Sequence, residues 1–114
     1  MIKEYAFKWI KALRSGKFKQ GKNALCTVEG KTAKYCCLGV LCHILKTPYT
    51  KNEGGFKEYE GNDGSLPKSI MKKCNIDDDF GCYFGGVESL AALNDNGKSF
   101  KQIADVIEQN WKQL

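Results

Sequence analysis

Six cysteines and one histidine are the residues of this 114-residue chain whose chemistry could serve catalysis or metal binding. Such residues support three chemistries in general: a catalytic thiol, a structural zinc site and a disulfide framework. Three of the cysteines lie close to the histidine, in the segment with Cys36, Cys37, Cys42 and His43. The other three are Cys26, Cys74 and Cys82.

The spacing of these residues does not suit any of the three chemistries. Residues 1–10 lack the apolar stretch of a secretion signal, so we expect no oxidising compartment and no disulfides. No C-x2-C pair is present, as a structural zinc site requires. If the segment is helical, His43 lies about 10 Å along the axis from Cys36 and on a different face from Cys37, so it cannot act as base for either thiol.

We therefore expect the cysteines to be small buried side chains, and we expect no enzyme activity, no bound metal and no cofactor. A cysteine-dependent enzyme stays open as an alternative, because a thiolate at a helix N-terminus is stabilised by the helix dipole. The sequence also lacks the phosphate-binding G-x4-G-K-[ST] loop, the G-x-S-x-G elbow and the H-E-x-x-H zinc motif.

Positive charge is concentrated in the N-terminal third of the chain. Residues 1–34 contain nine Lys or Arg and two Glu, a net charge of +7, whereas the remaining residues sum to −2. Such a patch attracts anions, which include nucleotides, nucleic acid and acidic protein surfaces. A solvated lysine surface without a ligand is the simpler alternative. No recognition-helix motif accompanies the charge, so we do not expect DNA binding.

Polar and aromatic side chains near this patch could form a small-molecule site. The loop after the first helix combines cations with Gln20, and the turn Asn94-Asp95 could supply directional hydrogen bonds. The alternative is that Asn94 and Asp95 only cap backbone groups in a tight turn. Aromatic residues such as Phe18 and Tyr35 could stack on a base. The predicted ligand-binding residues are Arg14, Lys17, Lys19, Gln20, Tyr35, Asn94 and Asp95.

The elements that would position these residues can be predicted from periodicity. An apolar stripe over residues 2–13 indicates a helix that Gly16 can end. Residues 25–35 read as a β-hairpin with Gly30 in its turn, and the loop 15–22 precedes it. Residues 36–46 are apolar on nearly all sides, which indicates a buried central helix.

Inside that central helix Gly39 is unfavourable by up to about 1 kcal/mol relative to Ala, and close approach of another backbone would explain its presence. Residues 49–65 suggest a loose second hairpin or a structured loop. We expect a helix that starts at Leu66-Pro67-Lys68, a glycine-rich loop over 81–86, and a short helix over 87–93. A capping box of Ser99 and Gln102 begins the last helix.

These elements predict one α+β domain over residues 1–114, dominated by helices, with a β-hairpin and a C-terminal α-hairpin. With 42% apolar residues the chain can bury roughly two thirds of its unfolded surface, which is enough for a core. No run of residues approaches the length of a membrane span, so we expect a cytoplasmic protein with no membrane partner.

Four motifs resemble a family of small proteins encoded by tailed phages and prophages, for which no reaction is assigned. They are LRSGKF-x-QG at 13–21, YCCLGVLC at 35–42, LP at 66–67 and LAALND-x-G-x-SF-x-x-IA at 90–104. The resemblance implies that the protein acts in the infected bacterial host. Short phage accessory proteins often block a defence protein or sequester a nucleotide signal.

The basic N-terminal third, the Asn94-Asp95 turn and the resemblance to phage proteins together predict a non-catalytic counter-defence protein that binds an anionic ligand. The most specific form of this prediction is a nucleotide immune signal as the ligand. An inhibitor that binds a host defence protein is the alternative. The sequence leaves open whether the protein forms a homo-oligomer.

Overall fold

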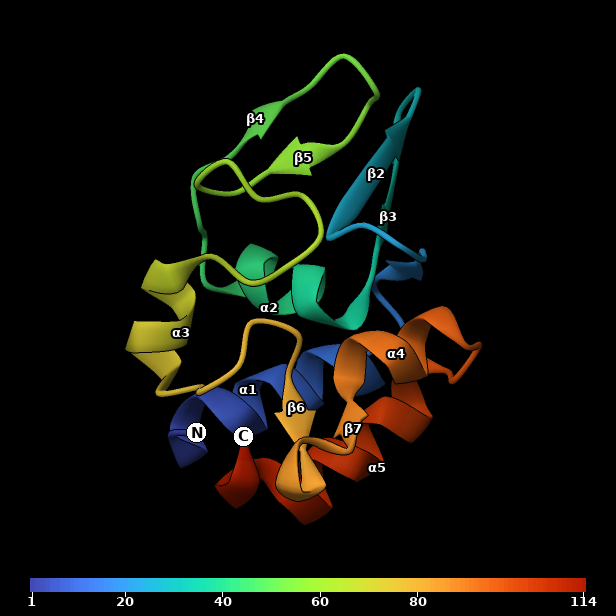
Figure 1. Ribbon diagram of the computed structural model, residues 1–114. Helices are drawn as coiled ribbons and strands as arrows, with labels where there is room; N and C mark the ends of the chain where they lie inside the picture. Colours follow the sequence, from blue (N-terminus) through green and yellow to red (C-terminus); the bar gives the residue numbers. More distant parts are fainter.

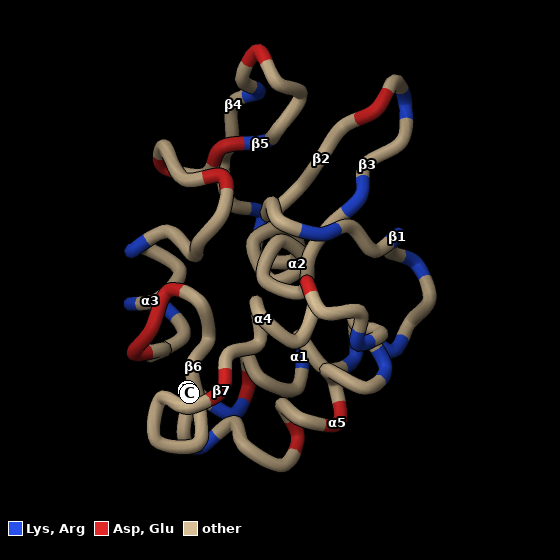
Figure 2. The backbone as a smooth tube through the Cα atoms, turned by 45° about the vertical axis from the view of Figure 1, so that its right-hand side comes forward, with Lys and Arg blue, Asp and Glu red and all other residues tan.

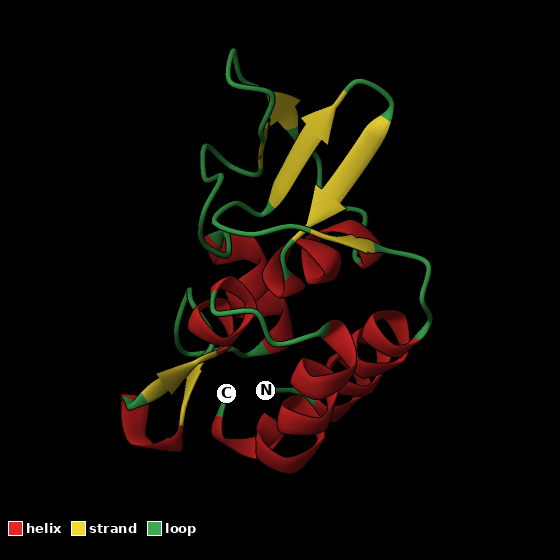
Figure 3. Cartoon of the chain, turned by 90° about the vertical axis from the view of Figure 1, so that its right-hand side faces the viewer, coloured by secondary structure: helices red, strands yellow, loops and turns green.

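The computed structural model describes residues 1–114, and a short helix, α2 (Cys37–Ile44), lies at its centre. Every residue from Cys37 to Cys42 is buried, as the apolar composition of this segment predicts. In Figure 1, α2 lies between a layer of strands above it and a layer of helices below it. Figure 3 shows the same division from the side, with the longest strands and most helices in opposite halves.

The helical layer is built on α1 (Lys3–Arg14) and α5 (Phe100–Asn110), which pack against each other. Trp9 is fully buried, and its indole N–H donates to the carbonyl of Cys37 at 2.8 Å, which ties α1 to α2. The chain leaves α1 through Ser15 and Gly16, whose φ of +74° is the left-handed end predicted for this helix. The capping box of Ser99 and Gln102 is also present.

The main sheet has three strands in the order β1-β3-β2. Strands β2 (Cys26–Glu29) and β3 (Thr32–Tyr35) form the predicted hairpin, with Gly30 at a φ of +61° in its turn. The sequence gives no sign of β1 (Lys19–Gln20), which pairs in parallel with β3. A strand of two residues has no alternation to detect, and this one forms because the tertiary structure brings it beside Tyr35.

Smaller elements complete the chain. A second hairpin, β4 (Thr50–Lys51) with β5 (Lys57–Glu58), forms within the segment 49–65, as predicted. Pro67 precedes α3 (Lys68–Cys74) directly, also as predicted. The remaining elements of this part of the chain are β6 (Cys82–Tyr83), the 3₁₀ turn η1 (Phe84–Gly86), β7 (Glu88–Ser89), α4 (Leu90–Asp95) and the terminal 3₁₀ turn η2 (Trp111–Gln113).

Two of these elements differ from the sequence-based expectation. The glycine-rich segment 81–86, expected as a loop, takes part in the short β6–β7 hairpin. Helix α4 begins three residues later than the predicted 87–93, because the Ser89 hydroxyl accepts a hydrogen bond from the Ala92 N–H and caps the helix there.

The close approach predicted at Gly39 is present. A Cβ atom on Gly39 would lie 1.7 Å from the carbonyl oxygen of Leu25, which is far inside van der Waals contact. The same carbonyl accepts the N–H of Cys36 at 3.2 Å. The glycine therefore lets α2 lie directly on the backbone that enters β2.

Together these elements confirm an α+β domain, dominated by helices and with one hydrophobic core. The two chain ends lie side by side in Figure 1, and the terminal ammonium of Met1 donates to the Leu114 carbonyl at 3.0 Å. None of the helices has the length and apolar character needed to cross a bilayer.

Replacing Gly39 with Ala tests the packing of α2 on Leu25. We expect Gly39→Ala to lower the free energy of unfolding by about 3 kcal/mol or more, because backbone at this contact cannot yield cheaply. Urea denaturation followed by circular dichroism measures the change. Gly64→Ala is the control, since a Cβ there meets nothing within 4 Å; equal stability of the two variants would refute the close contact.

Candidate functional site

Asn94, one of the predicted ligand contacts, is fully buried, and the protein itself fills its hydrogen-bonding capacity. The side-chain oxygen accepts from Gln20 Nε2 at 2.8 Å and from the Cys37 N–H at 3.2 Å. The amide nitrogen donates to the Gly21 carbonyl at 2.8 Å and to the Asp95 carboxylate at 3.4 Å. An amide has two donors and two acceptor sites, so none is left for a ligand.

Most of the other predicted contacts also bind the protein. Gln20 donates to the Lys98 carbonyl as well as to Asn94, and Asp95 accepts the N–H of Asn23 at 2.8 Å. Arg14 forms ion pairs with Asp105 at 2.7 Å and Glu108 at 3.2 Å, both on α5. These pairs raise the pKa of Arg14.

Lys19, another predicted ligand contact, is exposed on β1. Figure 2 shows that Lys and Arg recur along the chain around β1 and β3. Gln20, Asn94 and Asp95 thus hold segments together that are distant in the sequence, which differs from the simple capping of their own turn that the alternative interpretation expected for Asn94 and Asp95.

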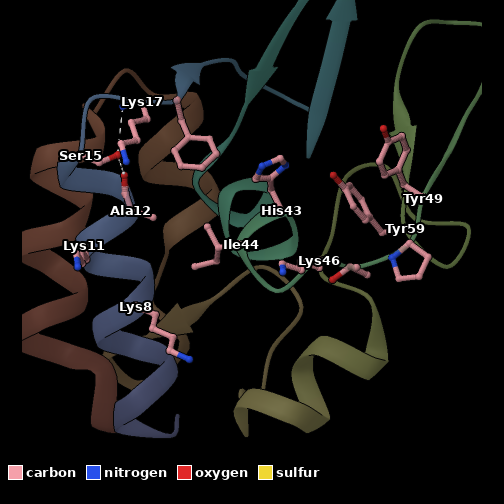
Figure 4. A pocket seen from close by; sticks show the side chains of 13 residues that line it. Lys8, Lys11, Ala12, Ser15, Lys17, His43, Ile44, Lys46, Tyr49 and Tyr59 are labelled. Carbon is pink, nitrogen blue, oxygen red and sulfur yellow. Dashed lines mark hydrogen bonds between the residues drawn. The ribbon is translucent and has the colours of Figure 1, made fainter.

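An open cleft of about 930 Å³ lies elsewhere, between α1 and the C-terminal end of α2. Figure 4 shows Lys8 and Lys11 from α1, and Ser15 directly after it, on one side, His43 and Ile44 from α2 in the middle, and two tyrosines on the other side. Of the predicted ligand contacts, Lys17 lines this cleft. Its other lining residues are Ala12, Phe18, Lys46, Thr47, Pro48, Tyr49 and Tyr59.

The cleft is positively charged. Four lysines line it, and no acidic residue does. Lys8 pairs with Glu4 one helical turn away at 3.2 Å, whereas Lys11, Lys17 and Lys46 form no salt bridge. Three cations are therefore free to meet an anion in the cleft.

Aromatic rings surround His43 at the centre of the cleft. The rings of Phe18, Tyr35 and His43 pack edge to face, with centroids 5.3 to 5.6 Å apart. Tyr35, a predicted ligand contact, is buried behind His43, and its hydroxyl lies 3.2 Å from His43 Nδ1. On the far side Tyr49 and Tyr59 form a second pair with centroids 5.8 Å apart.

Lys57 is a buried cation behind these rings. It is 8% exposed, its ammonium donates to the Tyr35 hydroxyl at 3.3 Å, and it lies 4.1 Å from the centroid of the Tyr49 ring. An ammonium can only donate, so the Tyr35 oxygen accepts from Lys57. Because Nδ1 of His43 is engaged by Tyr35, Nε2 is the ring nitrogen of His43 that has no partner within the protein.

The same neighbours shift the ionisation of this group of side chains. Burial of the ring lowers the pKa of His43, and the charge of Lys57 lowers it further. Burial raises the pKa of Tyr35 despite the nearby ammonium. Burial opposes the charge on Lys57, but the hydrogen bond with Tyr35 raises its pKa overall. At neutral pH the cleft therefore contains a neutral imidazole beside a protonated Lys57.

The cysteines lie apart from this cleft. Cys36, Cys37 and Cys42 are at most 5% exposed, and burial raises the pKa of Cys36 to about 11 and that of the other two thiols as well. The Cys82 thiol beside Asp78 also has a pKa raised to about 11. No group of three His, Cys, Asp or Glu side chains is arranged to hold a metal ion.

Sequence reasoning missed most residues of the cleft. A signal existed for its α1 wall, because Lys8, Lys11 and Ser15 follow one another at spacings of three and four along a helix. For His43 the sequence suggests roles only with the cysteines, as a base or a zinc ligand, and no role in a cleft with lysines and tyrosines. Nothing in the sequence brings Tyr49 and Tyr59 to the same wall, since that depends on the path of the β4–β5 hairpin.

Comparison with known proteins assigns the chain to a family. The model of the family described as "Domain of unknown function (DUF8296)" matches residues 1–111, so the chain belongs to this family. No curated protein and no solved structure matches the chain.

Removing the Asn94 amide tests its structural role. We expect Asn94→Ala to lower the free energy of unfolding by roughly 2 to 4 kcal/mol, because buried partners on Gln20, Gly21 and Cys37 lose their hydrogen bonds. Asn96→Ala, at an exposed position two residues away, should change it by less than about 0.5 kcal/mol. Equal midpoints of urea unfolding for the two variants would contradict the role assigned to Asn94.

The ionisation of His43 can be followed by NMR, because the sequence contains one histidine. We expect a pKa below the ordinary 6.5, and we expect Lys57→Met to raise it, since the nearby ammonium is removed. Because the pKa of His43 is lower in the folded chain than in the unfolded chain, the unfolded chain takes up the proton first. The free energy of unfolding should therefore fall as the pH drops below 6.5. Lys31→Met, at the β2–β3 turn, is the control; a His43 pKa that Lys57→Met leaves unchanged would refute the coupling.

Proposed function

We propose that this DUF8296 protein is a small phage or prophage accessory protein that binds an anionic, ring-bearing ligand in the cleft between α1 and α2. A nucleotide that signals immunity in the infected bacterium is the ligand we propose. In this proposal the protein acts in the cytoplasm of the host and sequesters the ligand without transforming it.

The observation that carries the proposal is the composition of the cleft. It combines four lysines with aromatic side chains and contains no acidic residue. Lysine ammonium groups bind phosphate oxygens, and aromatic rings stack on bases whatever their sequence. A volume of about 930 Å³ is near the upper end of the range for small-molecule sites, which suits a nucleotide with one or two rings.

The backbone of Lys46 also supports a ligand at this place. Lys46 follows α2 in the left-handed conformation, with a φ of +55°. Its N–H donates to the His43 carbonyl and that of Thr47 donates to the Cys42 carbonyl, the Schellman pattern in which glycine is preferred. A lysine at this position is less stable than a glycine by roughly 1 kcal/mol, and a charge required in the cleft accounts for it.

The protonation of the cysteine thiols supports a binding function more than a catalytic one. A thiol with a pKa of about 11 is protonated at neutral pH, so Cys36 supplies no thiolate nucleophile. The motifs at 13–21, 35–42, 66–67 and 90–104 support a phage origin through their resemblance to tailed-phage proteins.

A protein-protein inhibitor is the second candidate. At the turn between β6 and β7, Phe84 and Val87 are 65% and 77% exposed. Large apolar side chains at an exposed hairpin tip favour contact with a partner protein. This candidate would be favoured over ours if the protein bound no nucleotide and if Phe84→Ser abolished its binding to a host protein.

Native mass spectrometry with cyclic AMP, cyclic GMP, cyclic di-AMP, cyclic di-GMP and ADP-ribose identifies the ligand, and calorimetry then measures its affinity. We expect the double variant Lys17→Ala/Lys46→Gly to weaken binding at least tenfold, because charged hydrogen bonds are lost. Glycine at position 46 also relieves the left-handed backbone, so the variant stays folded.

The matched control is Lys31→Ala/Lys101→Ala, which removes the same charge from exposed positions outside the cleft. This control variant should bind the nucleotide with the same affinity as the protein without substitutions. An equal loss of affinity in both double variants would show that net charge alone attracts the ligand. Failure of all five nucleotides to bind would overturn the proposed function.

A further inference from the structure

Two hydroxyl groups in the lining of the cleft have no hydrogen-bond partner. They are Oη of Tyr59 and Oγ1 of Thr47, and both oxygens are buried. The Tyr59 side chain is only 1% exposed. More than nine tenths of buried polar groups in folded proteins find a partner, so two such groups in one cleft require an explanation.

Stability does not explain these hydroxyls. A buried hydroxyl without a partner destabilises the folded chain, and phenylalanine or valine would fill the same space without that cost. Tyr59 stays in place through its ring, which packs beside Tyr49. The hydroxyl adds nothing to that packing, so it is free to serve a group that enters the cleft.

The opposite side of the cleft holds a third free group. His43 Nδ1 is engaged by the Tyr35 hydroxyl, so Nε2 is the ring nitrogen that is left for a ligand. In Figure 4 the hydroxyl end of Tyr59 points toward His43 across the gap between α2 and the tyrosine wall. A planar group that enters this gap has hydrogen-bonding partners on both sides.

We propose that Tyr59, Thr47 and His43 form a subsite for the edge of a nucleobase, while Lys17 and Lys46 hold the phosphate. This inference rests on the proposed function and specifies which part of the ligand is recognised where. Base edges carry donors and acceptors, and a hydroxyl can serve either. An inorganic polyphosphate has acceptors only and no ring for the aromatic walls.

The Tyr49 ring lies beside this subsite. The Tyr59 hydroxyl is enclosed in the ligand-free chain, and the neighbouring Tyr49 ring is 51% exposed. Rotation of an exposed side chain takes nanoseconds or less, so the Tyr49 ring can turn to meet a base. Tyr49 then offers its face to the base as a stacking surface.

The variants Tyr59→Phe and Thr47→Val each remove one hydroxyl and keep its shape. We expect each to weaken binding of the tightest nucleotide of the five-member panel about tenfold, because a base loses a buried hydrogen bond. The melting temperature of the ligand-free protein should stay the same or rise, since no bond within the protein is lost. A purely structural role for either hydroxyl would lower it.

Tripolyphosphate, an anion without a base, separates this inference from the proposed function. The affinity of the protein for tripolyphosphate should be unaffected by Tyr59→Phe and Thr47→Val. Lys17→Ala should weaken the binding of both tripolyphosphate and the nucleotide. If nucleotide affinity survives both hydroxyl variants, or if tripolyphosphate binds as tightly as the nucleotide, the base subsite is refuted and the anion cleft stands. If neither probe binds the unchanged protein, the proposed function itself fails.

Discussion

The buried amide of Asn94 is the interaction on which the arrangement of the molecule depends. It holds β1 through Gln20 and Gly21, and it accepts the N–H of Cys37, which has no partner within its own helix. The N-terminal end of α2 is therefore anchored to α4 and β1. Gly39 lets the same helix lie against the Leu25 carbonyl. With these two contacts made, the other end of α2 is directed to the cleft, where it presents His43 and Lys46.

The basic residues of the N-terminal third divide into two groups by what they meet. Arg14 reaches the carboxylates of α5 and connects the two longest helices, whereas Lys11 and Lys17 face a cleft without acids. Lys57 adds a buried charge from the opposite direction, held by a hydroxyl and an aromatic face and not by a carboxylate. Burial of the ring and the charge of Lys57 both lower the pKa of His43, so the cleft offers an anion several ammonium groups and an uncharged imidazole.

Local signals in the sequence predicted the fold well where a single segment determines its own structure. The stripe of α1, the Ser99 capping box, the β2–β3 turn and the close approach at Gly39 are all present. The parallel strand β1 was missed because its partner β3 is brought to it by tertiary contacts. For the proposed site, the charged loop pointed to Lys17 and Phe18, which line the cleft, whereas Tyr35 lies buried behind His43. His43, Tyr49 and Tyr59 come together only when α2 and the β4–β5 hairpin are packed, which no local pattern encodes.

Chemical-shift mapping of the ¹⁵N-labelled protein tests the central claim, that the cleft is the ligand site, most directly. Each nucleotide of the panel is titrated in turn, and the backbone amides that shift are located. Binding in the cleft predicts shifts at Lys17, His43, Lys46 and Tyr49, together with the imidazole signal of His43. Shifts confined to β1 and α4, around Gln20 and Asn94, would contradict it, as would a titration in which no amide of the cleft moves.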